Sequence, residues 1–281
     1  RAVVLRLAPI GAEKSRLVAE ELQQAIRFEY MNRSEEAYAI EIKNYEMYPH
    51  LSILQARMAY VFYARGMIAR KSSPSQSAGY FKTSVEFAKN CVKQYPNDGE
   101  CWLFYGASLG RYSVAVGIFE TLSRIEEVHD AFEKAARLTR KDPFPFGPHG
   151  FNSSQAALMG LIEFYRVCPD WWLMEVIANI RGNKKKAYEL SAGIDPVDFD
   201  RAEVKVRAVL CYGAVSKNQK IIDEGTLIIR QAAHYELVQP LHFISRENIL
   251  YLDNFLTHHK SLGMSDYYKI GCEGIERPTG M

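Results

Sequence analysis

The sequence lacks several features that would assign it to a familiar class of proteins. No stretch of 18 or more consecutive apolar residues occurs, so we expect no membrane-spanning helix. Basic residues exceed acidic residues by only two, 35 against 33, which disfavours dedicated nucleic-acid binding. Glycine and proline, 18 and 11 of 281 residues, exclude collagen-like and low-complexity chains. With 48% hydrophobic residues, the chain can instead bury a substantial core.

The cysteines are few and scattered singly, without any CxxC pair. This distribution gives no support to a zinc ribbon or to a thioredoxin-like redox site, and an odd number disfavours a full disulfide framework. We therefore expect small buried hydrophobic residues, because free cysteine is among the most buried residue types. The five positions are Cys91, Cys101, Cys168, Cys211 and Cys272.

Catalytic and metal-binding motifs are also missing. The sequence contains no HExxH, no GxSxG, no P-loop and no GxGxxG after a strand. His258 and His259 are adjacent, so on a helix their side chains point about 100° apart and do not form an i, i+4 chelating pair. We expect no metal, no cofactor and no enzymatic activity.

Prolines, in contrast, recur at a regular spacing. Proline ends a helix because it lacks the backbone N–H and disfavours helix in the residue before it. The spacing predicts that every 44 to 53 residues the chain ends one helix pair and begins another. The prolines are Pro49, Pro96, Pro143, Pro196 and Pro240, separated by 47, 47, 53 and 44 residues.

The periodicity of apolar residues supports this division. The segments after Pro49 and Pro96 each show a helical apolar pattern, a polar break and a second helical pattern. No convincing period-two strand occurs, so the expected fold class is all-α. Ser34 is expected to cap the second helix. The expected helices are 13–30, 34–47, 51–70, 78–94, 102–119 and 123–140.

The order of large and small residues resembles the tetratricopeptide repeat, in which a small residue on one helix lets a bulky neighbour approach closely. We expect Gly106 at such a crossing. The first-helix matches are Trp102, Tyr105, Gly106 and Leu109 after Pro96, and Gln55, Met58, Ala59 and Phe62 after Pro49. The second-helix matches are Ser84, Ala88 and Cys91 and, more poorly, Ala37, Glu41 and Asn44.

The resemblance implies an α-solenoid of about five long TPR-like helix pairs. Its period of about 47 residues exceeds the usual period of about 34, so each pair carries longer helices and a longer loop. The expected organisation is a helical N-terminal cap over 1–33, a repeat domain over 34–270 and a C-terminal tail over 271–281.

Two narrower resemblances concern the fold and the class of protein. The block 96–106 with 141–143 resembles the regulator-of-microtubule-dynamics family, and the long helical repeats resemble the periplasmic T component of TRAP transporters. Together they imply a non-enzymatic scaffold or adaptor that holds partner proteins in a complex. The alternative is a transport accessory protein that binds a small ligand or a solute-binding protein. An apolar cavity would favour the alternative, and a tyrosine-lined groove the scaffold.

The first helices of stacked pairs line a concave face, and tyrosine there suits binding to peptides or partner helices. Plain packing between helices is the alternative for each residue of this face. Two tryptophans, Trp171 and Trp172, are adjacent, and we expect one of them to contact a partner or to pack between two repeats. The candidates are Tyr60, Tyr63, Arg111, Phe164, Tyr165 and Arg207, with Trp171 and Trp172. An oligomer fits this composition, and the compartment stays open between export to the periplasm and attachment to a membrane surface through a partner.

Overall fold

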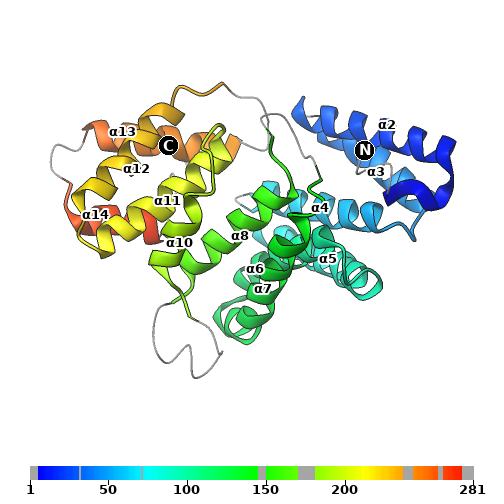
Figure 1. Ribbon diagram of the computed structural model, residues 1–281, viewed down its shortest axis with the longest axis horizontal. Helices are drawn as coiled ribbons and strands as arrows, with labels where there is room; N and C mark the ends of the chain where they lie inside the picture. Colours follow the sequence, from blue (N-terminus) through cyan, green and yellow to red (C-terminus); the bar gives the residue numbers. More distant parts are fainter. Residues whose placement is uncertain are drawn as a thin grey trace. The chain divides into compact units, whose positions relative to one another are not determined.

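A computed structural model describes residues 6–31, 33–70, 72–144, 150–169, 181–236, 243–258 and 262–273. Within these ranges the chain is all-helical and has no β-strand, which confirms the expected fold class (Figure 1). It divides into two compact units, Arg1–Ala157 and Leu158–Met281. This division differs from the expected boundaries after residues 33 and 270.

The first unit contains the helices that the proline spacing predicts. Helix α5 begins at Pro74 instead of the expected residue 78, because the first turn of a helix has no intrahelical use for the N–H that proline lacks. Ser34 is the first residue of α3 and forms no side-chain cap. The helices are α2 (Ala12–Tyr30), α3 (Ser34–Met47), α4 (Ser52–Ala69), α5 (Pro74–Gln94), α6 (Gly99–Val116) and α7 (Ile118–Thr139), preceded by the short 3-10 helix η1 (Ala8–Ile10).

Helices α4 to α7 pack mainly on their neighbours in sequence, and α4 also packs on α6, as first helices of consecutive pairs do in an α-solenoid. Small residues at the crossings make this close approach feasible. A Cβ atom added to Gly106 would lie 3.2 Å from the Cβ of Ala131, which confirms the expected close crossing of α6 and α7. The hydroxyl of Ser84 donates to the carbonyl of Ala59 at 2.5 Å and lies 2.5 Å from that of Ser108.

The second unit is arranged around one central helix. Helix α11 packs on α10, α12, α13, α14 and η3, and its buried face contributes Val206 and Leu210 to the core. The elements are α8 (Ser153–Val167, which begins in the first unit), α10 (Lys184–Ser191), α11 (Phe199–Val215), α12 (Gln219–Ala232), α13 (Phe243–His258), α14 (Met264–Tyr268) and the π-helix η3 (Lys269–Glu273).

Two disulfides correct the expectation of five free cysteines. Cys91 of α5 is bonded to Cys101 of α6, and Cys211 of α11 is bonded to Cys272 of η3. Folding brings these pairs, 10 and 61 residues apart in sequence, to Cα separations of 5.3 and 4.7 Å, which a disulfide spans. Cys168 is in neither disulfide and is buried, as expected.

The second disulfide lies where η3 approaches α11 closely. A Cβ atom on Gly271 would lie 2.3 Å from the backbone nitrogen of Cys211, so only glycine fits this contact. Arg166 of α8 donates to the carbonyls of Gly271 and Cys272 at 2.6 and 3.0 Å. The packed chain therefore continues through Glu273, beyond residue 271 where the tail was expected to begin.

Candidate functional site: an acidic pocket around Arg6

A pocket of about 460 Å³ opens in the first unit, where α5 ends and α6 begins. Its walls come from segments far apart in sequence, so it exists only after the helices have stacked. We call it the Arg6 pocket. Its lining residues are Arg6, Ser52, Gln94, Tyr95, Pro96, Asn97, Asp98, Gly99, Glu100, Leu138 and Asp142.

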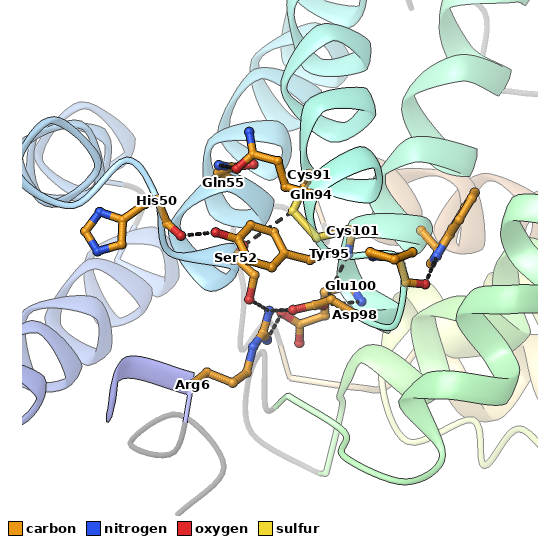
Figure 2. Close-up of a disulfide and its surroundings, with 12 residues drawn as sticks. Arg6, His50, Ser52, Gln55, Cys91, Gln94, Tyr95, Asp98, Glu100 and Cys101 are labelled. Atoms are coloured by element: carbon orange, nitrogen blue, oxygen red, sulfur yellow. Dashed lines mark hydrogen bonds and ion pairs between the residues drawn. A yellow bond between two sulfur atoms is a disulfide. The ribbon is translucent and has the colours of Figure 1, made fainter. Parts of the chain in front are cut away.

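The guanidinium group of Arg6 lies between two carboxylates (Figure 2). Its Nη1 is 2.5 Å from Oε2 of Glu100, and its Nη2 is 2.5 Å from Oδ2 of Asp98. The same Nη2 lies 3.4 Å from the hydroxyl oxygen of Ser52 at the start of α4. The pocket thus holds one cation against a pair of acids.

Local sequence fixes the position of Asp98. Its Oδ1 accepts hydrogen bonds from the backbone N–H groups of Glu100 at 3.0 Å and Cys101 at 3.4 Å, so Asp98 is the N-cap of α6. Because capping uses Oδ1, Oδ2 stays available to Arg6. The backbone N–H of Asp98 also donates to the carbonyl of Tyr95, which closes the turn between α5 and α6.

Three further contacts hold the surrounding segments. Leu7, next to Arg6, is fully buried in a cluster with Leu51 and Leu54, which anchors the N-terminal segment beside α4. The disulfide at Cys101 ties α6 to α5 directly after Glu100. The hydroxyl of Tyr95 donates to the carbonyl of His50, which ties the end of α5 to the segment before α4 (Figure 2).

Glu100 has the most perturbed charge in the pocket. Burial raises the pKa of Glu100 to about 7, because the side chain is only 3% exposed; Arg6 opposes this shift and Asp98 adds to it. Its Oε1 has no hydrogen-bond partner among the described residues, although its Oε2 is paired with Arg6. With exposed Asp142, the pocket presents three carboxyl groups to one guanidinium. The arrangement can therefore accept hydrogen bonds from a cationic group.

A second arginine-centred cluster lies deeper in the same unit. Arg57 of α4, 2% exposed, donates through Nε to Oε1 of Glu41 at 2.7 Å and through Nη2 to Glu29 at 3.2 Å. Burial raises the pKa of Glu41 to about 8, while Arg57 lowers it and Glu29 raises it. Glu41 occupies one of the small second-helix positions that matched the repeat poorly. A charged pair replaces the small residue there.

The candidates of the first unit take part in packing between helices. The ring of Tyr60 lies 5.6 Å from that of Phe104 of α6, and its hydroxyl bonds to Glu29. The ring of Tyr63 lies 5.9 Å from that of Phe81. Tyr60, Tyr63 and Arg111 are all partly exposed, so each keeps some surface for a partner.

The candidates of the second unit are more deeply placed. Phe164 and Tyr165 are only 9% and 6% exposed, with ring centroids 5.6 Å apart. Lys186 donates to the hydroxyl of Tyr165 at 2.5 Å. Arg207 is 5% exposed and donates to Glu203 at 2.6 Å. These contacts leave little side-chain surface at the three positions. Trp171 and Trp172 lie outside the described residues.

Sequence reasoning missed the Arg6 pocket. Asp98 stands directly before α6 and has a local signal, because aspartate in this position is a preferred N-cap. The block 96–106 was nevertheless interpreted only for fold and class of protein, and Asp98 was not singled out. Arg6 has no such signal, since it is 92 and 94 residues from its two acidic partners. Its role becomes visible only when the helices are stacked.

In comparisons with known proteins, no family model matches the chain and no curated protein matches it. The described residues contain no group of three or more His, Cys, Asp or Glu side chains that could hold a metal ion. Of the helices described, none is both long enough and apolar enough to cross a membrane. The resemblance to tetratricopeptide repeats therefore stays a prediction.

Proposed function

We propose that this chain is a non-enzymatic, TPR-like scaffold or adaptor that binds partner proteins within a multiprotein complex. The observation that carries the proposal is the packing of α4 to α7, where each helix contacts its sequence neighbours and the first helices contact each other. Stacks of this kind present extended surfaces, which helical-repeat proteins use for binding. Fold alone does not fix function, so the proposal needs a binding experiment.

A transport accessory protein that binds a small ligand is the second candidate. The volume of the Arg6 pocket, about 460 Å³, lies within the range of small-molecule sites. Its lining is charged and polar, whereas an apolar cavity was the feature expected for this alternative. The pocket therefore supports a charged group of a protein partner better than an apolar ligand.

The two disulfides support an oxidising compartment as the place of action. Disulfides persist in secreted and periplasmic proteins and are rare in the reducing cytosol. Rapid alkylation of the protein in its source, followed by mass spectrometry, tests this point. One alkylated cysteine, Cys168, is the expected result, and five would contradict it.

Mild purification of the tagged chain, followed by mass spectrometry of what accompanies it, tests the function. A stoichiometric protein partner supports the scaffold, and a monomer carrying a small ligand supports the alternative. If Tyr63 contacts the partner, Tyr63→Ala should weaken capture more than tenfold, which is about 1.4 kcal/mol, in a variant that stays folded at the temperature of the assay although it loses the contact with Phe81. Tyr80→Ala, on the second helix α5 of the same pair, is the matched control. Capture of neither partner nor ligand contradicts both candidates.

A further inference from the structure

We infer that the Arg6 pocket is a guanidinium-binding site, which Arg6 fills in the free chain and an arginine side chain of a partner protein fills in the complex. This inference rests on the proposed function, because it names the chemistry by which a partner is recognised. Its first support is the built-in occupant. A guanidinium already lies there, 2.5 Å from Asp98 and 2.5 Å from Glu100.

The second support is the unused capacity of Glu100. The side chain is 3% exposed, yet Oε1 accepts no hydrogen bond from the described residues. A buried acceptor without a donor is costly, and a guanidinium carries five N–H donors in a planar fork. Arg6 directs Nη1 to Oε2 of this carboxylate and Nη2 to Asp98. Oε1 is itself buried, so a guanidinium that enters more deeply than Arg6 and reaches both Glu100 oxygens would satisfy this carboxyl group more fully than Arg6 does.

Access separates this site from an ordinary internal ion pair. The side chains of Arg6 and Asp98 are 15% and 13% exposed and line the pocket, whereas the side chain of Arg57 is 2% exposed. Leu7 holds the backbone beside Arg6 in the core. The Arg6 side chain can therefore rotate out of the pocket without removing Leu7 from its place, and the N-terminal segment keeps its packing.

The charge of the pocket selects the ligand. Asp98, Glu100 and Asp142 outnumber the single arginine, so the lining repels phosphate and carboxylate groups and attracts cations. Arginine is favoured over lysine because two carboxylates already bind the planar fork from two directions, which a point charge does not match. The partner segment we expect is therefore basic and contains arginine.

Calorimetric titration of the full chain with N-acetyl-arginine amide tests the inference. Arg6→Ala should bind this probe at least tenfold more tightly than the wild type, because the occupant has been removed. The neutral isostere N-acetyl-citrulline amide should not bind. Glu100→Gln in the Arg6→Ala background should weaken binding at least tenfold. Arg33→Ala, which removes an exposed arginine paired with Glu36, is the matched control and should behave as wild type.

Melting of the same variants excludes a purely structural role for Arg6. Arg6→Ala should melt lower than wild type and recover with added N-acetyl-arginine amide but not with the citrulline compound. If Arg6→Ala melts too low to titrate, Arg6→Gln, which keeps most of the side chain, replaces it. The inference is overturned if the melting temperature of Arg6→Ala falls and does not recover with N-acetyl-arginine amide. It is also overturned if Arg6→Ala binds this probe no more tightly than the double variant with Glu100→Gln.

Partner capture by wild type and Arg6→Ala separates this inference from the proposed function. If the pocket variants capture the partner as well as wild type does but bind no probe, the scaffold proposal stands and the guanidinium site is ruled out. Probe binding by Arg6→Ala without any captured partner leaves the site standing and removes the scaffold.

Discussion

Two arginines of the first unit each lie between two carboxylates, but their surroundings differ. Arg57, with Glu29 and Glu41, is enclosed by α2, α3 and α4. Arg6, with Asp98 and Glu100, lines a pocket at the start of α6. The same chemical set therefore occurs once in a closed environment and once in an open one.

Burial, more than composition, decides what each of these charge clusters can do. In the closed cluster the arginine has no exit, so its task is to neutralise carboxylates that helix stacking has removed from water. In the open cluster the arginine lines a pocket, so we expect another cation to be able to replace it. Substitutions in and near the two clusters test this distinction.

The largest expected effect comes from Arg57→Met. It removes the cation from the closed cluster, so the buried Glu29 and Glu41 must stay charged without a partner or take up protons, which should cost on the order of 3–5 kcal/mol of unfolding free energy. Arg65→Met on the same helix is the control, because Arg65 pairs with the 81% exposed Glu35 and should cost at most about 1 kcal/mol. Equal losses in chemical denaturation would contradict the closed character of the Arg57 cluster.

Next is Gly106→Leu, which disturbs the helix that carries the open cluster without touching a charge. A leucine there must displace Ala131 and Phe132 of α7, at a cost on the order of 1–3 kcal/mol. Gly79→Ala in α5 meets no atom within 4 Å and should not lower the melting temperature. An unchanged midpoint for Gly106→Leu would mean that α6 and α7 do not cross as described.

The third prediction concerns pH. Burial raises the pKa of Glu41 to about 8 and of Glu100 to about 7, so each carboxyl holds its proton more tightly in the folded chain than in the unfolded chain. Their contribution to the free energy of unfolding is complete below about pH 4.3, the pKa of an unfolded glutamate, and is lost as the pH rises through the folded-state pKa values of about 7 and 8. The loss amounts to up to about 1.4 kcal/mol per pH unit and per proton.

Glutamine substitutions should divide this pH dependence between the clusters. Glu41→Gln should flatten the fall in unfolding free energy up to about pH 8, and Glu100→Gln only up to about pH 7. Denaturation curves measured from pH 5 to pH 9 provide the test. Curves parallel to that of the wild type would show that neither carboxyl is protonated in the folded chain.

The smallest expected effect comes from Asp98→Asn. Asparagine caps a helix about as well as aspartate, so this variant removes only the charge facing Arg6 and should cost at most about 1 kcal/mol. Asp98→Ala also removes the cap and should cost about 1 kcal/mol more. If both variants melt alike, Asp98 does not cap α6.

The sequence predicted the features that depend on residues close together in the chain. Proline positions and apolar periodicity predicted α3 to α7, and the spacing from Pro96 placed Gly106 at a close crossing, because one helix turn fixes which neighbours share a face. Arg6 was not predictable in this way, since its partners are more than 90 residues away. The two disulfides were missed because the bonded cysteines, 10 and 61 residues apart, come together only when their helices pack.

Glu41 shows a further limit of pattern reasoning. A charged residue in a position where the repeat has small residues does not match the repeat pattern, and only the structure shows that Arg57 lies opposite it. Pairing across helices is a property of two distant segments, so neither segment reveals it alone.

The disulfide between Cys211 and Cys272 has a consequence for how the protein is broken down. It closes a loop that contains α12, α13 and α14, because the bonded positions are 61 residues apart in sequence. A protease that cuts once inside this loop severs the chain but releases no fragment, because the sulfur bond still joins the two pieces. A molecule nicked once in this loop therefore keeps its apparent mass until a reductant breaks the disulfide.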